Sequence, residues 1–441
     1  MIKYIRFVII LFLFTATALG VKAQSTATTS SPYSRYGLGD ISPMLMPQNI
    51  AMGGIGVATN RINGFYSVNP LNPASYSSIG LTVIDIGVYS NFSTLEKTGS
   101  ASQKNSNFRL SHIAFGIPVS KRSAIAFGLM PYSELGYSYR QATPNFGSGL
   151  PADTNAVNYL YNGDGGLSKF YLGYGIGIGK HLSIGANVSY IFGNLKETQS
   201  TEVPSLIGVL NSRIEESNSI TGLNYDYGVQ YTVDFSARKH LTLGYSASSN
   251  TKLNTVNSYI VSSYFRDATN GDEGVATDTS VNRQQPSGKI QLPMTNRFGI
   301  SFQDEGKYLI GADYTMSNWS KLTVAGVNKQ LRDSKTINVG GQFTPNINSL
   351  SSYWAAVDYR LGAVYDQTYL YVNNTNIKRY AATFGLGLPL RGSTSSFYKI
   401  NLAAEIGKRG TLANSLVKEN YVNIHLSFTL NDKWFQKYKF D

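Results

Sequence analysis

Alternating apolar and polar residues dominate the chain from about residue 79 onward. In the clearest segment, 223–235, leucine, tyrosine, valine and phenylalanine occupy the odd positions, while asparagine, aspartate, glycine, glutamine and threonine occupy the even ones. A period of two places one kind of residue on each face of a β-strand. The pattern recurs at 182–193, 398–406 and 422–429, so it predicts an all-β chain whose strands have one apolar and one polar face.

Fourteen such segments are long enough to cross an outer membrane as tilted strands, which takes about nine to eleven residues each. Short and long connections alternate strictly between them, as expected for a barrel with periplasmic turns and external loops, whereas a soluble sandwich has no reason to alternate them. We therefore expect a 14-stranded antiparallel transmembrane β-barrel over 79–441. The predicted strands are 79–93, 107–119, 123–141, 167–179, 182–198, 216–236, 240–262, 289–304, 307–320, 334–344, 352–366, 375–390, 395–408 and 418–431.

Two segments precede the predicted barrel. Residues 1–23 begin with basic Lys3 and Arg6, continue through an apolar run at 7–19 and end on small residues, which is the pattern of a cleaved signal peptide. The mature protein is then exported to the bacterial outer membrane. Residues 24–78 lack the alternation and contain five prolines and a glycine cluster, so we expect them to fold into the lumen as a plug; a flexible periplasmic tail is the alternative.

Composition agrees with an outer-membrane barrel. The chain has 31 tyrosines, 21 phenylalanines and 43 glycines, and aromatic residues form the interfacial belts of such barrels. It has no cysteine, which excludes disulfides and a lipoprotein anchor. The net charge is +12, and +9 (35 − 26) without the predicted signal peptide; much of it falls in short connections such as 120–122, where solvated turns explain it better than nucleic-acid binding.

No pattern predicts an enzyme. The four histidines are not at metal-ligand spacing, and the chain has no nucleophile elbow of the Gly-x-Ser-x-Gly kind. The glycine-rich stretch 175–180 resembles a phosphate loop but lacks its spacing, and His181 replaces the hydroxyl residue that would bind magnesium. We therefore expect no catalytic residue, no cofactor and no metal site.

Several motifs resemble a known family. The glycines Gly53, Gly54 and Gly56, followed by Asn72-Pro73-Ala74, are similar to the N-terminal hatch of the FadL/TodX family of outer-membrane hydrophobic-compound transporters. Two features depart from that family: an additional Asn69-Pro70, and the segment 31–40, which has no counterpart in the transporters. Later features that resemble the family are Gly166-Leu167, Leu292-Pro293 with Gly299, Ala312-Asp313-Tyr314 with Trp319, and Tyr359-Arg360-Leu361-Gly362.

The resemblance implies passive uptake of long-chain fatty acids or hydrocarbons, which leave the barrel sideways through a gap beside a kink in the third strand. In this sequence Pro131 could cause that kink, with Gly128 and Gly136 beside it, because a proline cannot donate its ladder hydrogen bond. A harmless bulge at the rim is the alternative. The partners would be a hydrophobic small molecule and outer-membrane lipid. Candidate groove residues are Tyr159, Tyr161, Tyr259 and Tyr264, although composition favours an interfacial girdle for them.

Two other functions fit the same fold. Some proteins of this fold serve as docking or shuttle subunits of a type IX secretion machine, and their partners are other envelope proteins. A general porin is the third alternative, and a plug that fills the lumen argues against it. Lumen-facing charges are expected to tie the strands to the plug; they are Asp226, Asp234, Arg297, Asp313, Asp358, Arg360 and Glu405.

Overall fold

The computed structural model describes residues 31–145, 156–206, 208–267, 273–284, 286–324, 327–328, 330–349, 351–390 and 396–433. The predicted signal peptide and residues 24–30 of the predicted plug lie outside the described residues. In the described part, no helix is both long and apolar enough to cross a membrane.

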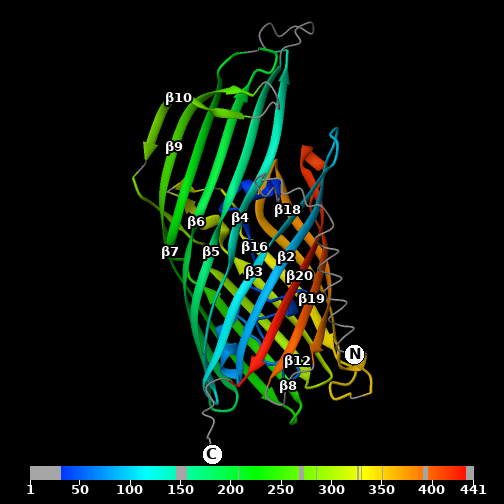
Figure 1. Cartoon of the computed structure of the whole chain (residues 1–441). Helices are drawn as coiled ribbons and strands as arrows, with labels where there is room; N and C mark the ends of the chain where they lie inside the picture. Colours follow the sequence, from blue (N-terminus) through cyan, green and yellow to red (C-terminus); the bar gives the residue numbers. More distant parts are fainter. Residues whose placement is uncertain are drawn as a thin grey trace, which may run out of the picture.

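A closed barrel of 14 antiparallel strands forms the wall (Figure 1). The first wall strand pairs with the last from Thr82–Asp432 to Lys97–Val417, which closes the cylinder. The wall strands are β2 (Thr82–Lys97), β3 (Gln103–Ser120), β4 (Ser123–Pro144), β5 (Ala156–Ile178), β6 (Leu182–Glu202), β7 (Asn211–Asp234), β8 (Lys239–Ser248), β12 (Thr295–Asp304), β13 (Tyr308–Ser317), β16 (Ser334–Phe343), β17 (Asp358–Val372), β18 (Thr375–Leu390), β19 (Phe397–Gly410) and β20 (Val417–Asp432).

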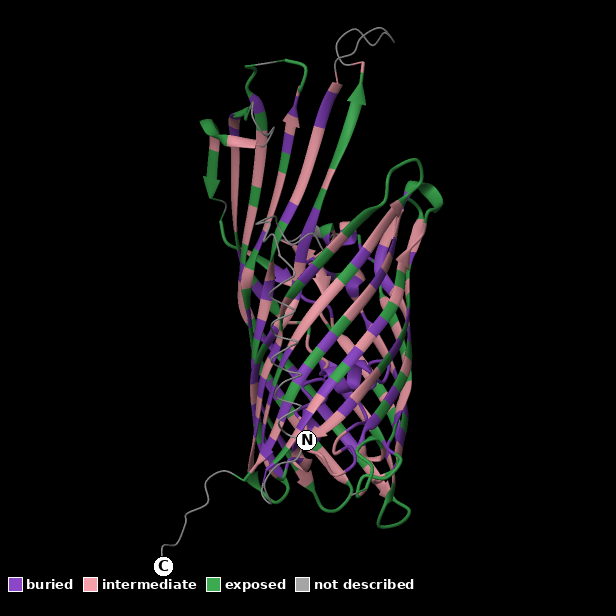
Figure 2. Cartoon of the chain, turned by 45° about the vertical axis from the view of Figure 1, so that its right-hand side comes forward, coloured by how far each residue is buried: buried purple, intermediate pink, exposed green. Residues whose placement is uncertain are grey.

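The wall is apolar outside and polar inside, the reverse of a soluble protein. In β7, Tyr225 and Tyr227 are exposed on the outer surface, whereas Asn224 and Asp226 between and beside them are buried in the lumen. Figure 2 shows the same alternation of exposed and covered residues around the wall. The fold class predicted from the period of two is therefore confirmed.

Two details of the strand prediction are wrong. The predicted strand 240–262 is divided into β8, which belongs to the wall, and β9 (Lys252–Arg266), which pairs with β7 and with β10 (Glu273–Gln284) beyond it. The strict alternation of short and long connections fails at Asn373-Asn374, which join β17 to β18 in a tight turn. Both asparagines have positive φ, 46° and 60°, as the favoured two-residue hairpin turn requires.

One side of the barrel rises well beyond the other, as both views show. The β4–β5 ladder continues to Pro144–Ala156, the β5–β6 ladder to Asn158–Glu202 and the β6–β7 ladder to Thr201–Ser212. Together with β9 and β10, these strand ends form what we call the projecting sheet. The short β11 (Gly288–Gln291) leads from it back to β12 and also pairs with β14 (Thr323–Val324), which pairs with β15 (Val327–Asn328).

The N-terminal segment 31–78, blue in Figure 1, lies inside the barrel. It contains η1 (Pro32–Arg35), β1 (Asp40–Ile41), α2 (Pro47–Ile50) and η2 (Pro73–Ser78). Its apolar side chains pack against the small lumen-facing residues of β3 and β4, among them Ala114, Ala124 and Ala126. Three further short helical turns lie at strand ends: η3 (Trp319–Lys321), η4 (Trp354–Ala356) and η5 (Ala413–Ser415).

Candidate functional site

The ladder between β3 and β4 stops halfway up the wall. It runs from Ser120–Ser123 to Ile113–Leu129 and ends there. Beyond that point β3 continues to Gln103 paired with β2, and β4 continues to Pro144 paired with β5. Within the described residues, no ladder joins β3 to β4 above Leu129, so the two strands diverge. We call this interruption the gap.

Pro131 lies two residues beyond the last β3–β4 pair. It has no N–H to donate to a ladder, and the β4–β5 register shifts between Pro131 and Ser133, so Tyr132 forms a bulge. The break in the ladder therefore coincides with the proline that sequence analysis singled out. Gly128 still pairs with Ala114 below the gap, and Gly136 lies above it.

An ion pair bridges the gap. The guanidinium of Arg109 on β3 contacts the carboxylate of Glu134 on β4, and it also lies over the ring of Tyr89, 4.7 Å from the ring centroid. Both charged side chains are largely covered, with 27% and 15% of their surface exposed. Side chains thus hold the two strands together where the backbone no longer does.

Residues 31–42, which we call the strap, run along the free edge of β4. Asp40 and Ile41 pair antiparallel with Glu134 and Ser133. Further along, the N–H of Ser31 donates to the carbonyl of Gly136 (3.0 Å). The strap therefore takes up part of the β4 edge that β3 has left.

The other side of the strap is attached to the wall beyond β3 and β2. The hydroxyl of Tyr33 donates to the carbonyl of Val417 (2.5 Å), and that of Tyr369 donates to the carbonyl of Gly39 (2.7 Å). Asp40 forms an ion pair with Arg409 at 2.8 Å. Burial raises the pKa of Tyr33 to about 12, so its hydroxyl keeps its proton and continues to donate. The strap thereby crosses the barrel from β4 to β17, β19 and β20.

An apolar cluster fills the upper end of the barrel around the strap. Tyr33 and Leu38 of the strap belong to one apolar cluster with side chains from the projecting sheet, from β11, from the segment around η3 and from β17 and β18. Trp319 stacks on Tyr369 with ring centroids 4.4 Å apart. The lumen is therefore covered from above by packed side chains.

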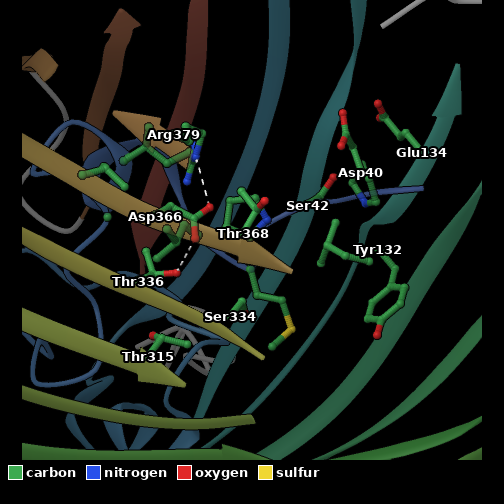
Figure 3. A pocket seen from close by; sticks show the side chains of 18 of the residues that line it. Asp40, Ser42, Tyr132, Glu134, Thr315, Ser334, Thr336, Asp366, Thr368 and Arg379 are labelled. Carbon is green, nitrogen blue, oxygen red and sulfur yellow. Dashed lines mark hydrogen bonds and ion pairs between the residues drawn. The ribbon is translucent and has the colours of Figure 1, made fainter. Parts of the chain in front are cut away.

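A cavity of about 440 Å³ lies within the barrel wall beside the strap. Its lining includes Arg109 and Leu110 from one edge of the gap and Pro131, Tyr132 and Glu134 from the other. Figure 3 shows Tyr132 and Glu134 on one side of the cavity and residues of β16 to β18 on the other. The cavity therefore extends to both edges of the gap.

Most charges on the cavity lining are paired. Arg379 forms ion pairs with Asp366 (3.4 Å) and Glu405 (3.0 Å), and Thr336 donates to Asp366 at 3.0 Å (Figure 3). Lys169 is paired with Asp226 at 2.7 Å. Ion pairs of this kind satisfy buried charges but leave an interior that is polar.

A second group of paired charges lies in the lumen away from the gap. Asp358 accepts from Arg360 (3.0 Å) and from Lys399 (2.8 Å), and all three are buried. Asp313 accepts from the backbone N–H groups of Gly56 and Val57, at 2.6 and 2.8 Å. Asp313 therefore ties the N-terminal segment to the wall, as the sequence analysis expected of lumen-facing charges. For the other six the expectation is wrong, because they bind residues of the wall: Asp226, Asp234, Arg297, Asp358, Arg360 and Glu405.

The predicted hatch residues hold the N-terminal segment in place. Gly53 has positive φ, and its N–H donates to Thr383 Oγ1 (2.8 Å); a Cβ there would lie 2.4 Å from the carbonyl oxygen of Val339. Asn72 caps η2 by accepting from the N–H of Ala74 (3.1 Å), and Pro73 is the first residue of that helix. Of the six predicted residues, Gly53, Gly54, Gly56, Asn72, Pro73 and Ala74, only Gly54 lines the cavity.

The four candidate groove tyrosines lie on the projecting sheet, and none lines the cavity. Tyr161 stacks on Tyr139 (ring centroids 4.9 Å apart). Tyr264 is fully buried and donates to Glu202 (2.9 Å). Tyr159 is opposite Gln141 and Thr201, and Tyr259 is opposite Glu216 and Arg283.

Sequence analysis did not single out Arg109 or Glu134. Each is a single charged residue on a predicted strand, and only the folded structure shows that their side chains meet. No group of histidine, cysteine, aspartate and glutamate side chains able to hold a metal ion occurs among the described residues.

Comparison with solved structures agrees with this architecture. The toluene transporter TodX of Pseudomonas putida superposes with a TM-score of 0.56 at 14% identity, covering 89% of this chain and 99% of that one. A FadL homologue of Pseudomonas aeruginosa gives 0.53 at 12%, covering 90% and 100%, and the toluene transporter TbuX of Ralstonia pickettii gives 0.52 at 16%, covering 88% and 98%. No curated protein matches the chain.

These likenesses define the class: the fold is that of the FadL type of bacterial outer-membrane channel, as the hatch motifs indicated. The family follows from the sequence itself. The model of the BamG family matches residues 1–441, and the chain belongs to that family.

Proposed function

We propose that this protein is an outer-membrane channel for passive uptake of hydrophobic compounds, which pass sideways between lumen and membrane at the gap. One observation carries the proposal: the cavity is lined from both strand edges where the β3–β4 ladder is missing. The solved structures with the same fold include proteins described as toluene transporters. In this proposal residues 1–23 are removed on export and residues 31–78 act as the plug.

The surroundings of the gap support a lateral route. On β3, Phe108 and Leu110 are 72% and 44% exposed, and on β4 Leu129 is also exposed. Apolar side chains of this kind suit contact with lipid, so the lower end of the gap belongs to the membrane. Unpaired backbone groups are costly in hydrocarbon unless they face protein or water, and the cavity and strap lie directly behind them.

The covered upper end of the barrel also favours a lateral route over a vertical one. Tight turns gather at the lower end, which we assign to the periplasm, so the apolar cluster and the strap close the side that faces the medium. A general porin needs an open vertical path, and the packed cluster opposes it.

A crosslink across the gap tests the proposal. The chain has no native cysteine, so the pair Arg109→Cys and Glu134→Cys can be joined selectively by a short bis-maleimide. In proteoliposomes, uptake of a labelled long-chain fatty acid and of toluene should fall to the level of empty vesicles after crosslinking. Phe298→Cys with Tyr314→Cys, which are directly opposite on the intact β12–β13 ladder and do not line the cavity, is the control and should keep full uptake. Unchanged uptake through the crosslinked gap would refute the lateral route.

A further inference from the structure

Three lysines, which we call the lysine cluster, lie on the outer face of the wall near its upper end. Lys335 is on β16, Lys378 on β18 and Lys408 on β19, and all three side chains are exposed. Each is followed directly in the chain by a residue that lines the cavity inside the barrel; these residues are Thr336, Arg379 and Arg409. Successive side chains of a strand point to opposite faces, so the three lysines point away from the lumen.

The register of the sheet brings the three lysines close together. Lys335 and Lys378 are both opposite Gln367 on β17, which lies between them. Lys408 is opposite Tyr380, two residues along β18 from Lys378, so these two lysines are diagonal neighbours. Neighbouring strands are about 4.8 Å apart and diagonal pairs about 7–8 Å apart, so Lys378 lies within roughly 10 Å of each of the other two.

No carboxylate neutralises the lysine cluster. Among the described residues, none of its three members forms an ion pair, whereas the inward-facing Arg379 and Arg409 beside them are each paired with a carboxylate. The ammonium of Lys408 lies over the ring of Tyr380, 5.8 Å from the ring centroid. Positive charges at this spacing repel one another, so an anion bound between them stabilises the arrangement.

The lysine cluster lies where the apolar outer wall gives way to the upper strand ends. Near the top, β16 begins one residue before Lys335, β18 begins three residues before Lys378, and β19 ends two residues after Lys408. Two positions closer to the middle of each strand, the outer face carries exposed apolar side chains; these are Ile337, Tyr380 and Ile406. At such a border the hydrocarbon of the membrane meets the head groups, and long lysine side chains place their ammonium groups among the head groups.

We propose that the lysine cluster binds the phosphate groups of a lipid in the outer leaflet. A phosphate monoester carries close to two negative charges and three acceptor oxygens, so a head group with one or two of them can accept from several ammonium groups at once. The acyl chains of the lipid then lie against the apolar wall around Ile337 and Ile406. Only the choice of leaflet rests on the topology given in the proposed function; the binding does not.

Lipid binding to the purified full-length barrel tests this proposal. The barrel in a non-ionic detergent is titrated with diphosphoryl lipid A, monophosphoryl lipid A and phosphatidylcholine, and bound lipid is counted by native mass spectrometry. Each basic side chain at an anionic lipid surface strengthens binding about fivefold, so diphosphoryl lipid A should bind at least about tenfold more tightly than phosphatidylcholine, with the monophosphoryl form between them. Equal affinity for the three lipids would overturn the proposal.

Variants locate the site. A triple variant removes the charge of the lysine cluster: Lys335→Gln, Lys378→Gln and Lys408→Gln. Its affinity for diphosphoryl lipid A should fall about a hundredfold, while its affinity for phosphatidylcholine stays unchanged. The corresponding triple substitution by arginine keeps the charge and should keep the affinity.

The matched control removes three lysines from turns at the lower end of the barrel: Lys121→Gln, Lys180→Gln and Lys239→Gln. These lysines are also exposed, so the control loses the same net charge and should bind lipid A as the unaltered protein does. Equal losses in the two triple variants would mean that only the overall charge matters, and would overturn the site. A large excess of inorganic phosphate should leave the lipid bound, because acyl chains add apolar contact; displacement would indicate a site for free anions instead.

The two proposals fail separately. Lipid binding is measured in detergent and does not depend on the gap, whereas the crosslink reports on uptake across a bilayer. Selective binding of lipid A with uptake unaffected by the crosslink would refute the lateral route alone. Uptake that the crosslink blocks, with no preference among the three lipids, would refute the lipid site alone.

Discussion

Arg109 and Glu134 form an ion pair between two neighbouring strands at a level where those strands share no backbone hydrogen bonds. Everywhere else around the lower wall, the ladder itself joins each strand to the next. At the gap, the ion pair between these two side chains joins the strands instead.

Breaking this pair should loosen the gap. Arg109→Gln and Glu134→Gln are each expected to raise uptake of a hydrophobic probe severalfold, because the strand edges then separate more readily. A double-mutant cycle on unfolding should give a coupling of about 1 kcal/mol, since both side chains, although largely covered, keep some exposure to solvent. Additive effects of the two substitutions, with uptake unaltered, would show that the pair does not hold the gap.

Restoring a donor at position 131 should have the opposite effect. Pro131→Thr supplies an N–H and a β-favouring side chain, so the ladder can extend past Leu129. Hydrogen exchange on β4 above the gap should slow, and uptake should fall severalfold. Pro144→Thr, at the far end of the same strand, is the control and should leave uptake unchanged. Slower exchange with undiminished uptake would show that transport does not depend on the kink at Pro131.

The strap depends on a glycine. Gly39 has φ +90°, and a Cβ there would lie 2.4 Å from the carbonyl oxygen of Glu134. Gly39→Ala should therefore destabilise the barrel by about 2 kcal/mol or displace the strap. Gly99→Ala has a similar φ of +77° but open space around it, and it should cost about 1 kcal/mol. Urea unfolding in liposomes measures both, and equal costs would mean that the strap adjusts freely.

The buried charges around Asp358 should be sensitive to removal of the shared partner. Asp358→Ala leaves Arg360 and Lys399 buried without their carboxylate, and we expect a loss of about 3–5 kcal/mol in the free energy of unfolding. Glu96→Ala breaks the more exposed pair with Lys418 and should cost at most about 1 kcal/mol. Similar losses for the two variants would contradict the role of burial.

Strand positions could be predicted from the sequence because membrane strands combine a period of two with a strong contrast between lipid and lumen faces. The division of 240–262 into β8 and β9 could not, because both parts keep the alternation while the chain leaves the wall at 249–251. Pro131 was visible as a ladder breaker, since its effect is local. Arg109 and Glu134 were not, because they meet across a part of β3 and β4 that shares no ladder.

The strap shows the same limit of prediction from local sequence. Its sequence was recognisable as a departure from the transporters, but nothing local in residues 31–42 indicates that Tyr33, Gly39 and Asp40 reach β20, β17 and β19. Those contacts join residues more than 300 positions apart. They exist only once the barrel has closed.

The projecting sheet makes the barrel lopsided. A neighbour in the membrane that approaches β2 or β20 meets a wall of ordinary height, whereas one that approaches β5 or β6 also meets a water-exposed surface above the bilayer. The two sides of the barrel therefore differ in what they can contact. The side of β2 and β20 faces only lipid and membrane-embedded proteins, whereas the side of β5 and β6 is also open to molecules outside the membrane.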